Sequence, residues 1–285
     1  MKKEDAITKI ISWASQRENI QVLLLSGSLA NAVRADDLSD IDLAVFGYDF
    51  NFIENDQWLS EIGSPCVCIH DHFNFEQHTI PSRLTIFSKG LKIDFSFHPL
   101  EIIERMVENG YLPNDYNNGY KILLDKTGLT NNLPEPDLKG FRLLMPDAAQ
   151  FKKNENEFWF EIYHIAKYLK RNDVWAAKSR EGHAKVCLLK VLEWGQGLKS
   201  NWQFSPKQEG RGLQTWLDAD QMEQLSECFS AYDLTENWTA LNHLIRFYRF
   251  QTEKTAANLG MIYNKALDQS ISDFVNSLQL EMHKG

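Results

Sequence analysis

A short glycine-containing turn near the start of the chain has the residue types needed to hold a phosphate group. Gly27 and Ser28 follow the apolar run Val22-Leu23-Leu24-Leu25, which is typical of a buried strand. A residue without a side chain lets the backbone approach a ligand, and the Ser28 hydroxyl and neighbouring N–H groups can bind an anion. The turn therefore predicts a phosphate-binding loop in which Gly27, Ser28 and Asn31 contact the ligand.

Two carboxylates, Asp40 and Asp42, come shortly after this turn at alternate positions of a second strand pattern. In an extended strand both would project from one face, with Ile41 turned into the core. Two negative charges held this close destabilise a fold unless a cation neutralises them. Because Mg²⁺ binds one or two carboxylates together with phosphate oxygens, the pair predicts a metal ion and a nucleotide at the same place.

A third carboxylate, Asp94, lies in the segment 91–97, where apolar residues occupy the odd positions and polar residues the even ones. Asp94 is expected on a central strand beside Asp40 and Asp42, as a further metal ligand or as a general base. Clustered Asp residues beside a strand commonly form only a solvated turn. The ordered combination of strand, Gly-Ser turn, Asp-x-Asp and a later Asp favours the catalytic interpretation.

The charge distribution favours a cationic partner. The formal net charge is −9; residues 1–145 contain 13 Lys and Arg against 21 Asp and Glu, and the remainder contains 17 against 18. Nucleic-acid enzymes need a basic surface to neutralise phosphates, so a nucleic-acid substrate is not expected. An acidic cleft attracts a polycation.

No apolar stretch is long enough for a membrane span, and the first residues lack the apolar core of a signal peptide, so a cytoplasmic protein is expected.

Cys66, Cys68, His70 and His72 alternate along one predicted strand and superficially suggest a metal site. Ligands on one strand lie roughly 7 Å apart, and zinc ligands usually have a turn between pairs. The sequence therefore favours thiols packed in the core over zinc ligands.

The chain is predicted to contain two domains, 1–140 and 141–285, of an α/β (α+β) fold class. Strands and helices alternate in the first, which predicts a mixed sheet, and the second is helical almost throughout. The expected strands are 20–26, 41–46, 65–70, 83–88, 91–97 and 120–124, with a hairpin turn at 88–90. The expected helices are 4–17, a short one from 28, 51–61, 99–108, 148–170, 174–195, 212–230, 234–258 and 265–280.

Three stretches resemble the aminoglycoside 6-adenylyltransferase (streptomycin adenylyltransferase) family of the nucleotidyltransferase superfamily. They are Gly27-Ser28 through Asp40-Ile41-Asp42, Gly90-Leu91-Lys92-Ile93-Asp94 with His98-Pro99-Leu100, and 156–171. The resemblance implies an N-terminal nucleotidyltransferase catalytic domain and a C-terminal helical substrate-binding bundle that closes over it. It departs from the family at Leu29, where the family carries Arg, and at Tyr168, where it carries Gly.

The implied reaction moves AMP from Mg-ATP to a hydroxyl of a streptomycin-like aminoglycoside, with pyrophosphate as the second product. Asp40, Asp42 and Asp94 would hold the metal, and Lys167 would meet nucleotide phosphate. The resemblance adds Glu181, on the helical domain, as an alternative base. Another hydroxyl acceptor, such as a lincosamide or a metabolite, is the alternative within this chemistry. A nucleotide-binding or antitoxin-like module without turnover is the alternative outside it. A monomer or weak dimer is expected.

Overall fold

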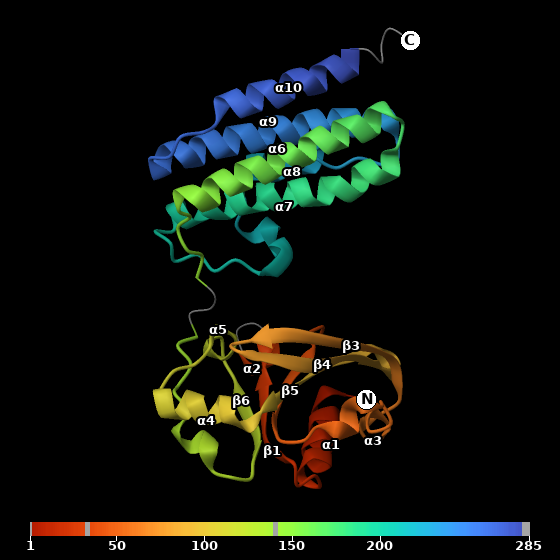
Figure 1. Ribbon diagram of the computed structural model, residues 1–285, viewed down its shortest axis with the longest axis vertical. Helices are drawn as coiled ribbons and strands as arrows, with labels where there is room; N and C mark the ends of the chain where they lie inside the picture. The colour runs from red at the N-terminus through yellow and green to blue at the C-terminus, as the bar shows by residue number, and fades with distance from the viewer. Residues whose placement is uncertain (1, 32–34, 139–141, 281–285) are drawn as a thin grey trace. The chain divides into compact units, whose positions relative to one another are not determined.

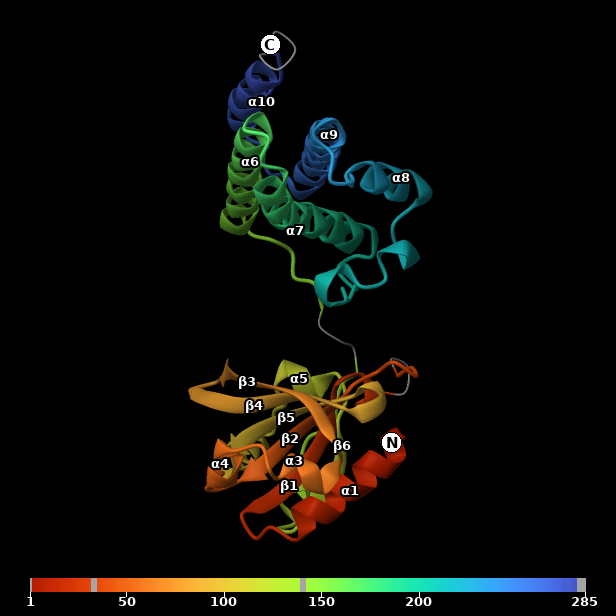
Figure 2. The same ribbon diagram turned by 90° about the vertical axis from the view of Figure 1, so that its right-hand side faces the viewer.

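The computed structural model of the chain describes residues 2–31, 35–138 and 142–280. The chain divides into two compact units, Met1–Phe141 and Arg142–Gly285, and each is described by itself. The first unit contains a sheet flanked by helices, and the second is built from helices (Figures 1 and 2). Within the described ranges, no helix is long and apolar enough to cross a membrane.

A mixed six-stranded sheet with the strand order β3-β4-β5-β2-β1-β6 forms the centre of the first unit. The strands are β1 (Ile20–Ser26), β2 (Ile41–Gly47), β3 (Pro65–Phe75), β4 (His78–Phe87), β5 (Leu91–Pro99) and β6 (Lys121–Asp125). Only β2 and β5 pair in parallel; the other neighbouring pairs are antiparallel. The predicted fold class, a mixed sheet followed by a helical region, is confirmed.

The helices of the first unit cover both faces of this sheet. They are α1 (Lys3–Ser15), α2 (Gly27–Ala30), η1 (Asn51–Glu54), α3 (Leu59–Ile62), η2 (Ser88–Gly90), α4 (Leu100–Asn109), α5 (Asn114–Asn117) and η3 (Leu129–Asn132). Leu23 and Leu25 pack in the core that α1 and α3 cover, whereas Val22 and Leu24 pack in the core that α4 and α5 cover. Because β1 is buried on both faces, its sequence is a continuous apolar run.

The hairpin of β3 and β4 is longer than the sequence predicted. β3 continues from the predicted end at position 70 to Phe75, and β4 begins at His78. Asp71, His72 and Asn74 break the apolar alternation that defines a half-buried strand. β3 lies at the edge of the sheet and most of its side chains are exposed, so its backbone pairing with β4 extends it without that alternation.

The expectation of core thiols is wrong for Cys66 and is met only in part by Cys68, which packs against the core of the first unit. Cys66 is exposed, and Cys68 is only partly buried. The reason is again the edge position of β3, which leaves one side of the strand without a neighbour in the sheet. Burial of the partly covered thiol nevertheless raises the pKa of Cys68 above its usual value.

The second unit consists of five α-helices with short 3-10 turns between α7 and α8. These elements are α6 (Ala148–Lys170), α7 (Val174–Lys199), η4 (Gln208–Gly210), η5 (Leu213–Thr215), α8 (Ala219–Glu227), α9 (Leu234–Leu259) and α10 (Lys265–Leu280). The ranges predicted for α6 and α10 coincide with the structure.

Two predicted helices are shorter in the structure, because a side chain accepts a hydrogen bond from a nearby backbone N–H group and a new helical segment begins there. The predicted helix 51–61 is split into η1 and α3, and Asn55 Oδ1 between them accepts a hydrogen bond from the N–H of Gln57. The predicted helix 212–230 begins only at α8, where Asp218 and Gln221 form a capping box. Asn and Asp commonly make such local hydrogen bonds instead of continuing a helix.

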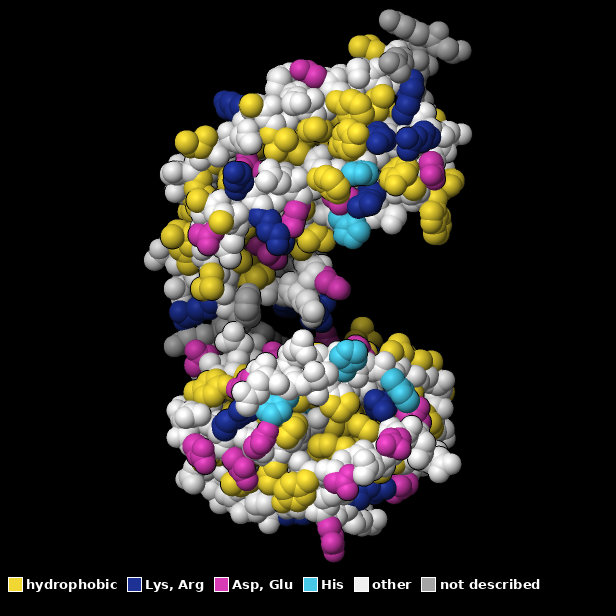
Figure 3. All heavy atoms as spheres, in the orientation of Figure 1, with side chains coloured by type: hydrophobic (Ala, Val, Ile, Leu, Met, Phe, Trp, Pro, Cys, Tyr) yellow, Lys and Arg dark blue, Asp and Glu magenta, His cyan; other side chains and the backbone are white. Residues whose placement is uncertain are grey.

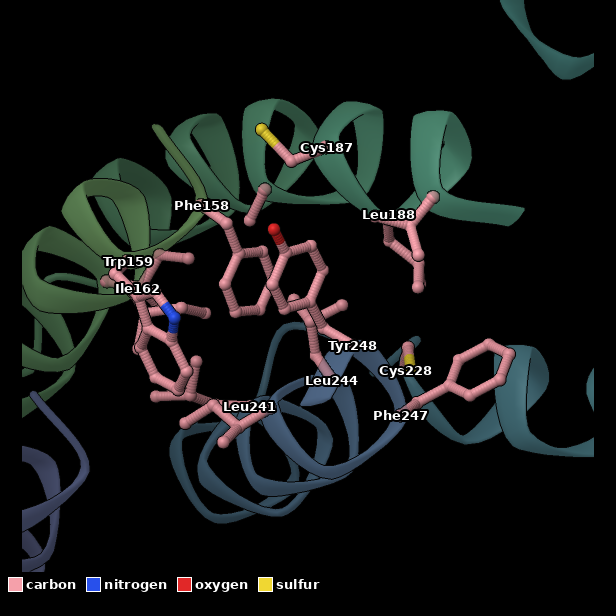
Figure 4. Packing of buried hydrophobic residues seen from close by; sticks show 14 of the residues in the cluster. Phe158, Trp159, Ile162, Cys187, Leu188, Cys228, Leu241, Leu244, Phe247 and Tyr248 are labelled. Atoms are coloured by element: carbon pink, nitrogen blue, oxygen red, sulfur yellow. The ribbon is translucent and has the colours of Figure 1, made fainter. Parts of the chain in front are cut away.

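Aromatic packing fills the core of the second unit (Figure 4). Phe158 on α6 stacks on Tyr248 on α9 with ring centroids 3.5 Å apart, and Trp159 is fully buried beside them. The Tyr248 hydroxyl accepts a hydrogen bond from Asn154 Nδ2, which satisfies its polar end within the apolar interior. These aromatic residues therefore hold α6 and α9 together as core side chains.

The carboxylate of Asp125 holds the turn after β6 through several hydrogen bonds. Asp125 accepts hydrogen bonds from the backbone N–H groups of Thr127, Gly128 and Thr130 and from the hydroxyls of both threonines. Burial alone would raise the pKa of Asp125, but the hydrogen bonds from Thr130 and Thr127 lower it well below its usual value. A carboxylate with a lowered folded-state pKa stabilises the fold above its unfolded pKa and loses that contribution as the pH falls.

We expect Asp125→Asn to lower the free energy of unfolding by about 1–3 kcal/mol at neutral pH, because an amide cannot accept all of these hydrogen bonds. The difference from the native protein should shrink as the pH falls below the ordinary Asp value of 3.8. Urea denaturation at several pH values measures it, with the exposed Asp115→Asn as the control. A difference that does not change with pH would contradict this explanation.

Candidate active site

The turn between β1 and α2 can be formed only by glycine at position 27. Gly27 has a φ of +66°, and a Cβ built there would lie 1.9 Å from Oδ2 of Asp42. Such a contact is impossible without moving the carboxylate, and the left-handed backbone conformation is itself unfavourable for other residues. The absence of a side chain therefore lets the turn lie directly against Asp42.

The register of the sheet brings the predicted carboxylates together. Asp42 on β2 lies opposite Ser26 of β1 and directly beside Asp94 of the parallel strand β5. Asp40 precedes β2 by one residue, and Ile41 between the two acids is buried. Although Asp42 and Asp94 are far apart in sequence, their positions in the parallel ladder place both side chains on the same face of the sheet.

Lys92 is part of this acidic group, and the sequence did not single it out. Its Nζ lies 3.0 Å from Oδ2 of Asp40 and 2.5 Å from Oδ2 of Asp94. Partial burial would lower the pKa of Lys92, but hydrogen bonds to Asp94 and Asp40 raise it, so the side chain is a stable cation. The available signal was its position two residues before Asp94, on the same face of β5.

The chemistry of these three carboxylates suits a hard divalent cation. Oδ1 of Asp94 is buried and has no hydrogen-bond partner in the part of the chain that the structure describes. A buried carboxylate oxygen without a partner is costly, and a metal ion would satisfy it. Since Asp40, Asp42 and Asp94 offer only carboxylate oxygens, the set suits Mg²⁺ better than a metal that prefers nitrogen or sulfur.

The other predicted loop residues lie close to this group. Ser28 is partly exposed within α2. Asn31 is buried, and its side-chain amide donates a hydrogen bond to the backbone carbonyl of Asn118. This hydrogen bond connects the end of the loop to the segment after α5. Lys121, at the start of β6, donates to the carbonyl of Leu29 at 2.9 Å and brings a positive charge to the loop. Lys121 could not be singled out from the sequence, because only the pairing of β6 with β1 brings it to the loop.

Glu181 and Lys167 belong to the second unit, and their part in the site stays a prediction. Glu181 on α7 is paired with Lys178 at 3.3 Å and Lys185 at 2.9 Å, and its side chain is mostly buried. Lys167 on α6 lies over the ring of Tyr163 and within 3.3 Å of its hydroxyl oxygen. Each side chain is thus held in place by neighbours on its own or the adjacent turn.

We expect Gly27→Ala to lower the free energy of unfolding by several kcal/mol, because the new methyl group would displace Asp42 as well as strain the backbone. Gly110→Ala is the matched control: Gly110 has a φ of +61°, with no atom near the position of the added Cβ. The control should lose only about 1–2 kcal/mol. Equal losses in the two variants, measured by chemical denaturation, would show that the close approach to Asp42 is unimportant.

Comparison with known proteins identifies the family. The family model described as streptomycin adenylyltransferase matches residues 1–278. An aminoglycoside 6-adenylyltransferase of Campylobacter jejuni is 24% identical over 93% of this chain and 92% of its own length. One of Staphylococcus aureus is 23% identical over 97% of this chain and 99% of its own.

Among solved structures, an aminoglycoside 6-adenyltransferase from Bacillus subtilis matches 98% of this chain and 99% of its own, with 23% identity and a TM-score of 0.47. The family model covers both the loop and carboxylates of the first unit and nearly all of the second unit. The chain therefore belongs to the streptomycin adenylyltransferase family and is an enzyme of the nucleotidyltransferase class.

Proposed function

We propose that the protein transfers AMP from Mg-ATP to a hydroxyl of a streptomycin-like aminoglycoside and releases pyrophosphate. The observation that carries the proposal is the pairing of Asp42 with Asp94 in the β2–β5 ladder, with the Gly27 turn against Asp42 and Lys92 between Asp94 and Asp40. The relatives in Campylobacter jejuni and Staphylococcus aureus are named for adenylyl transfer to aminoglycosides, which supports the same reaction here. In this proposal residues 1–140 form the catalytic domain and 141–285 the substrate-binding domain.

Asp40, Asp42 and Asp94 would hold the magnesium ion. When bound, the ion neutralises charge on the triphosphate and on the departing pyrophosphate. The protein contributes the fixed backbone positions of Asp42 and Asp94, because both are held by the β2–β5 ladder. Lys92 keeps Asp40 and Asp94 close together before a ligand arrives, so little rearrangement is needed when the nucleotide binds.

The loop side of the site would bind the triphosphate. Gly27 places the loop directly against Asp42, and the Ser28 hydroxyl can donate a hydrogen bond to a phosphate oxygen. Lys121 lies next to the loop and supplies the positive charge that Leu29 cannot. Lys167 is the proposed phosphate contact from the second unit. Together these groups would align the α-phosphorus with the acceptor hydroxyl.

The chemical step requires a base for the acceptor hydroxyl. The hydroxyl oxygen forms a bond to the α-phosphorus, the bond to the β-phosphate oxygen breaks, and pyrophosphate takes that electron pair. The hydroxyl proton passes to a carboxylate. We favour Asp94, which lies beside Asp42 in the β2–β5 ladder, over Glu181 on α7; in this role Asp94 would be the base in place of a metal ligand.

The acidic character of the first half supports a cationic acceptor. Residues 1–145 contain 21 Asp and Glu against 13 Lys and Arg. An aminoglycoside carries several positive charges, so it would be attracted to this half before specific contacts form. A lincosamide or a metabolite is the alternative acceptor. A nucleotide-binding module without turnover is less favoured, because a binder has no use for three converging carboxylates.

We expect pyrophosphate release from Mg-ATP in the presence of streptomycin, and little with other aminoglycosides or lincosamides. Asp42→Asn should reduce the rate by about a hundredfold or more, because it removes a ligand of the metal that carries the triphosphate. A coupled pyrophosphate assay measures the rate. The exposed residue Asp37 provides the control, Asp37→Asn, which should retain the native rate.

The same assay separates the alternatives. Release with a lincosamide but not with streptomycin would keep the chemistry and change the acceptor. ATP binding without release for any acceptor would favour the non-catalytic module. If Glu181→Gln abolishes release while Asp94→Asn retains ATP binding and partial release, the base is Glu181 and our assignment of Asp94 is wrong.

We expect Lys92→Met to destabilise the protein in the absence of magnesium by about 1 kcal/mol, because Asp40 and Asp94 then lose their shared cation. Added Mg²⁺ should restore most of this loss, so the thermal midpoint of the variant should rise more than that of the native protein. Lys89→Met, at an exposed turn, should behave like the native protein. An equal magnesium response in all three would contradict the role of Lys92.

A further inference from the structure

A second group of potential metal ligands lies at the edge of the sheet. Cys68 and His70 stand two residues apart on the edge strand β3, and Asp56 lies in the turn between η1 and α3. One ligand atom from each of these three residues lies within 4.8 Å of the others. His70 Nε2 is 3.0 Å from Oδ1 and 2.9 Å from Oδ2 of Asp56. An oxygen, a sulfur and a nitrogen donor from two separate segments of the chain therefore lie close together.

We propose that Asp56, Cys68 and His70 bind a zinc ion that ties the turn after η1 to the edge strand β3. A thiolate, an imidazole and a carboxylate are the three protein donors that Zn²⁺ uses, whereas Mg²⁺ and Ca²⁺ prefer oxygen alone. Three protein ligands leave a fourth tetrahedral position for water. The donor chemistry thus distinguishes this site from the all-carboxylate group around Asp42.

The distances are compatible with a tetrahedral ion. Zinc bonds of about 2.0–2.3 Å place neighbouring ligand atoms roughly 3–4 Å apart. The 2.9 Å distance between His70 Nε2 and Asp56 Oδ2 already lies at the short end of this range. The other distances between ligand atoms are at most 4.8 Å, so these atoms would need to move closer by about 1 Å at most. The His70 side chain is 51% exposed and that of Asp56 36%, so both can adjust and an ion can enter from solvent.

Neighbouring side chains orient two of the three donors, Cys68 and Asp56. The hydroxyl of Thr85 donates to the sulfur of Cys68 at 3.6 Å, which fixes the thiol toward the group. Arg83 Nε lies 3.6 Å from Oδ1 of Asp56, and the rest of its guanidinium is held by the carbonyls of Ser82 and Ile53. Partners of this kind, which hold a ligand in position, commonly accompany metal ligands.

The sheet separates this group from the candidate active site. Thr85 pairs with both Cys68 and Ile93, whereas the next position, Asp94, pairs with Leu84. Successive residues of a strand point to opposite faces, so Cys68 and Asp94 lie on opposite faces of the sheet. The zinc proposal therefore does not depend on the proposed adenylyl transfer. Figure 3 shows His side chains at the surface of the first unit beside acidic and basic ones.

Cobalt substitution tests the proposal directly on the full-length protein. We expect the metal-free protein to bind one equivalent of Co²⁺ with a thiolate-to-cobalt charge-transfer band, and Zn²⁺ to displace the cobalt while excess Mg²⁺ does not. Zn²⁺ should also raise the thermal midpoint, because it binds the folded state. Cys68→Ser should abolish the charge-transfer band, and the exposed His70→Ala should weaken binding by tenfold or more.

Matched controls lie on the same strand. Cys66 and His72 are exposed neighbours two positions before and after the ligand pair, so Cys66→Ser and His72→Ala change the same residue types outside the proposed site. Both controls should keep the band and the zinc-dependent rise in thermal midpoint. Absence of the band in the native protein, its survival in Cys68→Ser, or its loss in Cys66→Ser would overturn the proposal. Asp56 would then serve only as the ion-pair partner of Arg83 and His70.

Discussion

Mutual repulsion among Asp40, Asp42 and Asp94 is the constraint around which the first unit is arranged. Three negative charges at the junction of β2 and β5 would drive the strands apart if nothing opposed them. The parallel ladder fixes two of the acids side by side, and the buried residues Ile41 and Ile93 anchor those strands in the core. Lys92 then offsets part of the charge from the same face of β5. The ladder and Lys92 together thus hold these acids in place in spite of their like charge.

The second unit is held together mainly by the packing of apolar side chains, with some buried polar residues among them. Tyr248 stacks on Phe158 and receives a hydrogen bond from Asn154, so the one polar atom of that pair is satisfied. Arg249 and Asp268 join α9 to α10 through a two-contact ion pair. The role proposed here for residues 141–285 is to bind the acceptor.

Much of the fold could be predicted because its signals are local. The bounds of β1 follow from a continuous apolar run, and those of α6 from a capping box at Asp147 and a regular apolar face. Predictions were wrong where a single hydrogen bond or an edge position decided the outcome. Asp218 begins a new helix inside the range 212–230, and β3 extends to Phe75 because pairing with β4 replaces the missing apolar pattern.

In the candidate site, too, some residues have a signal in the sequence and others are recognised only once the strands are paired. Asp40, Asp42 and Asp94 could be selected because carboxylates on alternate strand positions are unusual and have a clear chemical use. Lys92 and Lys121 could not, since a lysine on a strand is ordinary until the register of the sheet places it beside an acid or a loop. The group of Asp56, Cys68 and His70 was likewise hidden, because Asp56 comes from a separate turn that the sequence predicted to be helical.

The parallel pairing of β2 and β5 also bears on how the protein folds. Lys92 contacts Asp40 across 52 residues of sequence, and β5 pairs with β2 although β3 and β4 lie between them in the chain. Contacts between distant parts of a chain form slowly, since the entropy of closing the loop must be lost first. Asp94 can therefore join Asp42 only after β5 has emerged from the ribosome and paired with β2, so the carboxylate group is incomplete in a shorter nascent chain.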